Sequence, residues 1–251
     1  MADAIVLYSV PEHLNSLLIL AKFISKHYPS TSVILLSTAA VSPPASVTYL
    51  RLPIPTLPQN FTSHYSEILF EIPRLNNPNL LQALQEISQK SKIKAFIIDF
   101  FCNSSFEVSS SLNIPTFFCV TTGAIGACSF LYWPTIHETI SGNIGELNDY
   151  IEIPGCPPIF SLDLPSGLFL RESNIYKHFL DTSINMRKSA GIIVNTIYAL
   201  EVRAMEALAN GLCVPDAPNP PFYSLGPLIS HDSGSAAGEH ECLRWLDLQP
   251  S

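Results

Sequence analysis

Short runs of consecutive apolar residues alternate with longer amphipathic segments along the chain. Each run has the length of a strand that is buried on both faces of a sheet. The runs are Ala4–Val10, Val33–Ser37, Ala95–Phe100, Thr116–Val120 and Gly191–Asn195, and Val47–Leu52 alternates as a half-buried strand does. Buried strands that alternate with helices predict an α/β fold, in which a parallel sheet carries helices on both faces.

Three amphipathic segments predict helices between these strands. Apolar residues follow helical spacing from Leu14 to Tyr28, with polar residues on the opposite side. Asn77 followed by Pro78 is typical of a helix start, so a second helix is expected from there. Tyr198–Asn210 predicts a third helix, which Gly211 ends.

One stretch is long enough to raise the question of a membrane span. No charged residue occurs between Val108 and His137, and a span takes about 20 apolar residues. The stretch also contains two prolines and two glycines. We therefore expect a buried strand, a tight turn and a buried helix, and no transmembrane segment.

The composition favours a folded protein in a reducing compartment. Of 251 residues, 47% are hydrophobic and 14% are charged, which predicts a large core and excludes a disordered chain. A net charge of -8 argues against nucleic-acid binding, because neutralising phosphates takes an excess of Lys and Arg. The six cysteines form no Cys-x-x-Cys pair and no basic leader precedes the first apolar run, so a cytoplasmic location is expected.

A change in composition predicts a domain boundary near residue 230. His231–Gly238 is rich in Ser, Gly and Ala, as flexible linkers are. Glu239–Leu248 then reads as a new amphipathic helix that has nothing after it to pack against. We expect residues 1–230 to form one domain, and residues 231–251 to form a linker and the first helix of a second domain.

His13 and Asp99 are the candidate chemical pair. His13 follows the first strand and Asp99 ends the fourth, and in the usual strand order 3-2-1-4-5 these two strands are neighbours. A histidine that accepts a proton and a carboxylate that orients it form a general-base pair, and the helix N-terminus is expected to keep His13 neutral. The alternative is a histidine that caps a turn and an aspartate that caps a helix.

Seven segments resemble, in the expected order, the plant family 1 UDP-sugar glycosyltransferases, and most closely the branch that acts on flavonoids and related phenolics. The resemblance covers essentially the whole chain. The segments are Val10–Lys22 (VPEHLNSLLILAK), Ile97–Cys102 (IIDFFC), Ile114–Ala124 (IPTFFCVTTGA), Pro154–Pro165 (PGCPPIFSLDLP), Gly191–Glu201 (GIIVNTIYALE), Tyr223–Leu228 (YSLGPL) and Glu241–Asp247 (ECLRWLD).

The resemblance implies a fold and a reaction. The family has two facing Rossmann-like domains, the GT-B arrangement, of which the first holds the acceptor and the second holds the UDP-sugar. The base deprotonates an acceptor hydroxyl, which attacks the anomeric carbon, expected to be that of glucose, with inversion. UDP-sugar is then a co-substrate, and neither a cofactor nor a metal is required.

The resemblance also assigns roles to individual residues. It makes His13 the catalytic base and Asp99 its partner. Thr121 falls where the family contacts the donor sugar or phosphate, although its hydroxyl is equally suited to capping the next helix. Phe101 falls where an aromatic ring packs on a planar acceptor, although composition alone favours a core position for it. Phe118 is assigned to the same pocket, with a core position as the alternative. The other aromatic residues that are candidates for lining this pocket or for the core are Phe130, Tyr132 and Trp133.

Two departures from the family pattern affect the expected function. Glu12 stands where the family usually has Gly, and its carboxylate is expected to raise the pKa of His13. The donor-binding segment of the family, rich in Trp, His, Gly and Glu, is absent from these 251 residues. The chain is therefore expected to be the acceptor-binding half of a glycosyltransferase, and inactive alone.

Other functions are weighed against this one. A single-domain protein that binds a phenolic without turnover is the main alternative, which coding sequence for a donor domain after Ser251 would exclude. The chain has no Gly-x-Ser-x-Gly elbow and no Gly-x-Gly-x-x-Gly loop, which argues against a serine hydrolase and a nicotinamide enzyme.

Overall fold

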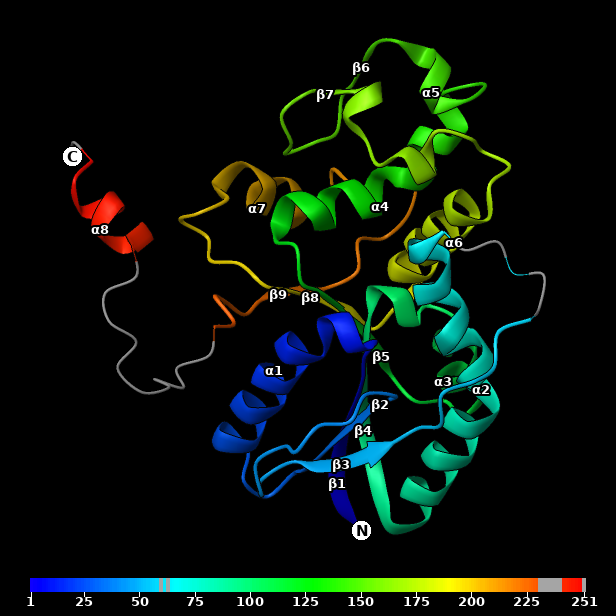
Figure 1. Cartoon of the computed structure of the whole chain (residues 1–251), viewed down its shortest axis with the longest axis vertical. Helices are drawn as coiled ribbons and strands as arrows, with labels where there is room; N and C mark the ends of the chain where they lie inside the picture. The colour runs from blue at the N-terminus through cyan, green and yellow to red at the C-terminus, as the bar shows by residue number, and fades with distance from the viewer. Residues whose placement is uncertain (59–60, 62–63, 230–240, 250–251) are drawn as a thin grey trace.

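A seven-stranded parallel sheet forms the centre of the molecule (Figure 1). The computed structural model describes residues 1–58, 61, 64–229 and 241–249. The strands run in the order β3-β2-β1-β4-β5-β8-β9. They are β1 (Ala2–Tyr8), β2 (Ser32–Ser37), β3 (Thr48–Arg51), β4 (Ser91–Asp99), β5 (Thr116–Val120), β8 (Gly191–Val194) and β9 (Phe222–Ser224). The predicted α/β fold and the 3-2-1-4-5 strand order are confirmed.

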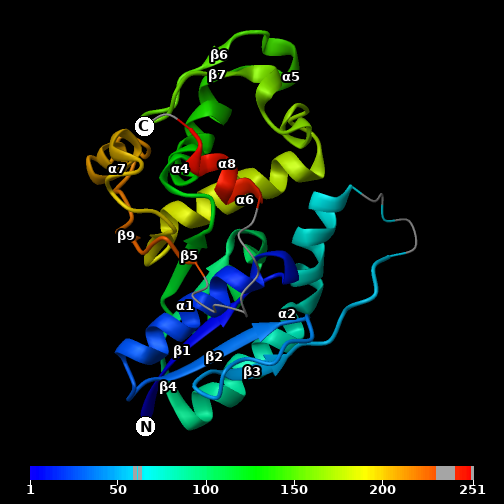
Figure 2. The same cartoon turned by 60° about the vertical axis from the view of Figure 1, so that its left-hand side comes forward.

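Helices cover both faces of the sheet, because successive strand residues point to opposite sides. On β1, Leu7 faces a core shared with α1 (Leu14–His27), whereas Val6 and Tyr8 face the larger core on the other side. Figure 2 shows α1 and α2 on opposite sides of the strands. The helices of the larger core are α2 (Tyr65–Lys90), α3 (Ser105–Ser111), α4 (Ala124–Thr139), α6 (Asn174–Lys188) and α7 (Val202–Ala209).

The helix expected to start at Asn77-Pro78 begins at Tyr65 instead, so that prediction is wrong. α2 runs through Pro73 and Pro78, each of which removes one backbone donor. Leu69 and Phe70, upstream of these prolines, are buried on the same helix face as Leu80 and Leu84 further along. Burial of this apolar face outweighs the local preference of proline for the first turn.

Several elements of the structure were not predicted from the sequence. They include α6, β9 and the hairpin of β6 (Tyr150–Ile151) and β7 (Ile159–Phe160). The stretch without charges between Val108 and His137 contains β5, a tight turn and α4, as expected. The remaining short elements are α5 (Ile144–Leu147), η1 (Pro11–His13), η2 (Phe100–Cys102), η3 (Ser161–Asp163) and η4 (Ser166–Leu168).

The C-terminal segment forms a short helix, α8 (Glu241–Asp247). Trp245 and Leu246 on this helix are 60% and 56% exposed. The predicted linker His231–Gly238 and the side chain of Leu243 lie outside the described residues. Across the described residues, no helix combines the length and the apolar character that crossing a bilayer requires.

Candidate active site

The carboxyl ends of β1 and β4 lie side by side and bring His13 and Asp99 together. The two strands pair in parallel up to Tyr8 and Ile98. His13 ends the short helix η1 and directly precedes α1. Its Nδ1 lies 3.2 Å from Oδ1 of Asp99. The pair predicted from strand order is therefore present in the structure.

Asp99 is fixed by hydrogen bonds from both neighbouring strand ends. Its side chain is fully buried, and a buried carboxylate requires such partners. The amide of Phe101 donates to Oδ1 at 2.8 Å, and the amide of Val10 donates to Oδ2 at 3.1 Å. The Ser9 hydroxyl adds a donor at 3.3 Å. Asp99 thus caps the short helix η2, as the alternative interpretation expects, and it also contacts His13.

The pKa of His13 is raised, contrary to the expectation that the helix N-terminus keeps the imidazole neutral. Burial by itself lowers this pKa, because it disfavours the charged form. The hydrogen bond and charge of Asp99, with the charge of Glu12, more than offset burial. A proton on Nδ1 is held by Asp99, which leaves the lone pair of Nε2 to accept a second proton.

His13 opens into an apolar cavity of about 260 Å³. Phe101 lies over the imidazole, with ring centroids 5.2 Å apart. The walls are largely phenylalanine rings that pack on one another; for example, Phe100 stacks on Phe130 at 4.3 Å. The lining residues are His13, Phe100, Phe101, Val120, Thr121, Thr122, Phe130, Pro165 and Phe179. Such a site suits a flat aromatic molecule that presents a polar group to the histidine.

Comparisons with known proteins agree on one family, although no family profile matches the chain. The chain is 50% identical to the baicalein 7-O-glucuronosyltransferase of Scutellaria baicalensis over 240 residues, which cover 93% of this chain and 54% of that protein. It is 40% identical to the anthocyanidin 5,3-O-glucosyltransferase of a Rosa hybrid cultivar, covering 99% of this chain and 57% of that protein. Among solved structures, UGT2 of Phytolacca americana complexed with UDP-2fluoro-glucose and pterostilbene superposes with a TM-score of 0.80 at 27% identity, covering 100% of this chain and 58% of that one.

Over nearly its whole length the chain is similar to one half of the plant UDP-glycosyltransferases. It spans about half the length of the relatives it matches. The sheet and its helices correspond to half of the two-domain GT-B fold that this family shares.

Within this UDP-glycosyltransferase fold, the structure separates pocket from core among the predicted aromatic residues. Phe101 and Phe130 line the cavity. Phe118 does not, so its assignment to the pocket is corrected. It shares a face of β5 with Val120 but lies two residues further from the strand end. There it is fully buried, with its ring 6.2 Å from that of Phe106.

Thr121 lies in the turn between β5 and α4 and lines the cavity that contains His13. The first amides of α4 are capped by Glu201 from another part of the chain, so the alternative of a capping hydroxyl does not describe Thr121. Five residues of the cavity wall were not predicted from the sequence: Phe100, Val120, Thr122, Pro165 and Phe179. Phe179 belongs to α6, whose apolar residues follow helical spacing and signal an amphipathic helix.

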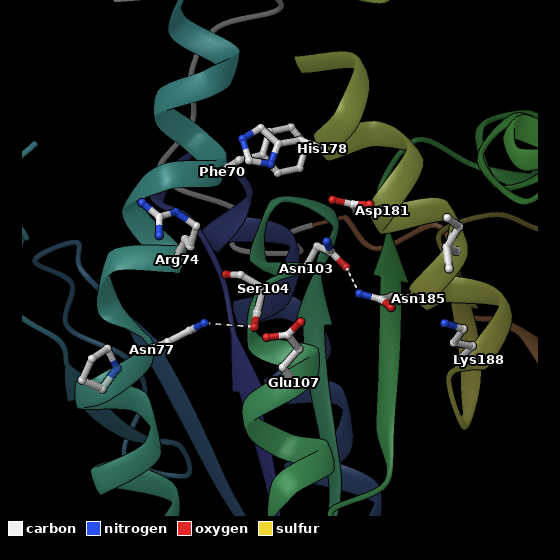
Figure 3. A pocket seen from close by; sticks show the side chains of 12 residues that line it. Phe70, Arg74, Asn77, Asn103, Ser104, Glu107, His178, Asp181, Asn185 and Lys188 are labelled. Carbon is white, nitrogen blue, oxygen red and sulfur yellow. Dashed lines mark hydrogen bonds between the residues drawn. The ribbon is translucent and has the colours of Figure 1, made fainter. Parts of the chain in front are cut away.

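A second, larger cavity of about 690 Å³ lies between α2, α3 and α6 (Figure 3). Its wall is polar and carries charges of both signs, among them Arg74, Glu107 and Lys188. His13 is not part of it. Phe70 and His178, stacked at 4.8 Å, line this cavity, and Phe70 also packs on Phe101, 4.9 Å away. The two cavities are thus neighbours with different chemistry, and the smaller one is lined by His13, which contacts the buried Asp99.

Metal ligands are not gathered at either cavity. Among the residues that the structure describes, no group of three or more His, Cys, Asp or Glu side chains is placed to hold a metal ion.

Proposed function

We propose that this chain forms the acceptor-binding half of a glycosyltransferase that transfers a sugar from a UDP-sugar to a phenolic hydroxyl of a flavonoid-like molecule. The observation that carries the proposal is a buried Asp99 that holds His13 at the mouth of an apolar, phenylalanine-lined cavity. The names of relatives point the same way, since they specify baicalein and anthocyanidin as acceptors.

The proposed reaction uses the free nitrogen of the imidazole. A phenol has a pKa near 10, so at neutral pH it is mostly protonated and a weak nucleophile. Nε2 of His13 accepts its proton while the phenolic oxygen forms a bond to the anomeric carbon of the sugar. The bond from that carbon to the UDP oxygen breaks, UDP leaves with the electron pair, and the carbon inverts. Asp99 stabilises the imidazolium that results.

The remaining expectations follow from the same proposal. Thr121 contacts the donor sugar or phosphate from the acceptor side, and Phe101 packs against the planar acceptor. Glucose is the proposed sugar, UDP-glucose is the co-substrate, and no metal takes part. All six cysteines are free thiols, which supports the reducing cytoplasm as the location.

The test is a fusion of this chain to the part of the Rosa glucosyltransferase that it does not match. The fusion is expected to transfer glucose from UDP-glucose to baicalein, whereas the 251-residue chain is expected to bind baicalein without transfer. Product formation is measured by liquid chromatography, and binding by calorimetry. A fusion that folds, binds UDP and binds baicalein yet transfers nothing would favour the alternative, a single-domain phenolic-binding protein.

A further inference from the structure

The N-terminus of α4 is occupied by a carboxylate from a distant part of the chain. α4 begins at Ala124, directly after the turn that contains Thr121. The amide of Ala124 donates to Oε2 of Glu201 at 2.7 Å, and the amide of Ile125 donates to Oε1 at 3.0 Å. Glu201 lies in the connection between β8 and α7, and α7 packs beside α4 in Figures 1 and 2.

Two further residues accommodate this carboxylate: Thr196 donates a hydrogen bond to it, and Gly123 leaves room for it. The hydroxyl of Thr196 donates to Oε2 of Glu201 at 2.5 Å, so three donors converge on one side chain. Gly123 lies directly under it, and a Cβ at that position would come within 2.7 Å of Oε2. Gly123 also has a φ of +89°, which other residues rarely adopt. Only glycine gives both the turn and the room for the carboxylate.

Gly126 leaves room for the side chain of Thr122 in the same turn. A Cβ at Gly126 would come within 2.1 Å of the Thr122 hydroxyl oxygen. The start of α4 therefore carries no side chain at the two positions where Glu201 and Thr122 pack against it. The turn from Thr121 to Gly123 is held between the end of β5 and this capped start of α4.

We propose that Glu201 is a positioning residue, which fixes Thr121 and Thr122 in the cavity wall by serving as a built-in anion at the N-terminus of α4. The proposal deepens the proposed function and rests on it for the catalytic consequence. A helix N-terminus at the carboxyl edge of a parallel sheet is a common site for a phosphate group. Here its first two amides are already taken, so a phosphate group of the donor would have to displace Glu201 to bind them.

The charge of Glu201 is stabilised by this arrangement. Burial raises its pKa, but the hydrogen bonds from Thr196 and from the amides of Ile125 and Ala124 more than offset burial, so the pKa is lowered. A group whose pKa is lower in the folded than in the unfolded chain stabilises the fold above its unfolded pKa. That stabilisation is lost as the pH falls through the folded pKa. The contribution of Glu201 is thus fully present at neutral pH.

The first test uses the 251-residue chain and thermal unfolding. Glu201→Ala should lower Tm by about 2–6 °C, as loss of a helix cap does in a chain of this size. Sodium formate, a small carboxylate, should restore part of that loss relative to sodium chloride at equal ionic strength. Glu206→Ala is the matched control, because Glu206 is a nearby carboxylate on α7 that accepts a hydrogen bond from the Tyr198 hydroxyl, at 3.1 Å, and does not cap α4. Equal Tm values for the two variants, or no specific effect of formate, would overturn the proposal.

A second measurement separates positioning from general stability. In the fusion, well below Tm, Glu201→Ala should lower kcat at least about tenfold with little change in KM for baicalein, and formate should restore kcat. Glu201→Gln keeps the size and one acceptor oxygen, so its kcat should lie between those of the unmodified fusion and the alanine variant. The glutamine variant replaces the alanine variant if the latter does not fold. An unchanged kcat would contradict the positioning role, even with the Tm loss observed. An inactive fusion with an intact Glu201 contradicts the proposed function instead. In that case the Tm and formate measurements alone decide whether the carboxylate of Glu201 caps α4.

Discussion

Two carboxylates set the charge around His13, and they do so from different positions. Asp99 is buried behind the ring and is hydrogen-bonded to it, whereas Glu12 is an exposed neighbour in the chain. Glu12 has a partner of its own, since the Tyr65 hydroxyl donates to its Oε1 at 2.5 Å. The raised pKa of His13 means that protonation removes the free base at a higher pH than in an ordinary histidine. Transfer should therefore decline as the pH falls through this pKa.

Replacing Glu12 tests this electrostatic account at the scale of a single residue. Glu12→Gly removes one of the charges that raise the pKa of His13, so the acid limb of the pH–kcat profile of the fusion should move to lower pH. At neutral pH, kcat should be equal or higher, because more of the base is free. Tyr65→Phe is the control: it removes the hydrogen bond to Glu12 and keeps the charge, so the acid limb should not move down. A large loss of kcat in Glu12→Gly would show that Glu12 contacts a substrate.

The candidate residues differ in how far the sequence could place them. His13 and Asp99 could be predicted as a pair, because His13 follows one recognisable strand, Asp99 ends another, and the usual strand order makes those strands neighbours. Glu201 could not be predicted as the cap of α4, because its partners lie in a segment that only tertiary packing brings near. Phe118 was misassigned because position along a strand decides whether a ring faces a cavity or the core.

At the scale of elements, α6 completes the cavity opposite the strand ends. It supplies Phe179, whose ring packs edge-on against Phe100 with centroids 4.9 Å apart. A flat acceptor in this cavity would lie among these rings. The ring shape of Phe179, more than its bulk, should therefore matter for binding.

A conservative change on α6 tests that role. Phe179→Leu keeps an apolar side chain and loses the flat ring, so the affinity of the 251-residue chain for baicalein should fall about 2- to 10-fold. Phe160→Leu is the control, because Phe160 lies in the β6–β7 hairpin and packs on Tyr150 instead of lining the cavity. Calorimetric titration measures both. Equal affinity of the two variants would mean that α6 does not contact the acceptor.

The helices and strands could be predicted where their local sequence pattern was typical of one kind of element. The buried strands and α1 could be predicted because uninterrupted apolar runs and helical spacing are strong local signals. The start of α2 was misplaced because proline is a strong local signal that burial of Leu69 and Phe70 overrides. β9 was missed because it has only three residues and depends on pairing with β8.

At the scale of the whole molecule, the two halves of the proposed enzyme divide the work. The described residues supply His13, the carboxylate of Asp99 that contacts it, and an apolar cavity at the carboxyl edge of the sheet. This chain spans about half the length of its relatives, and those relatives are named as transferases. The central claim is that the His13–Asp99 pair of this half activates the acceptor hydroxyl.

The most direct test compares His13→Ala, Asp99→Asn and the double variant in the fusion, with kcat as the readout. A positioned base contributes about 10²–10⁴-fold, so His13→Ala should lower kcat by roughly that factor while the affinity for UDP-glucose stays nearly unchanged. Asp99→Asn should also lower kcat substantially. The double variant should lose much less than the product of the two losses, because Asp99 acts through His13. A His13→Ala fusion that keeps the kcat of the unmodified fusion would contradict the account.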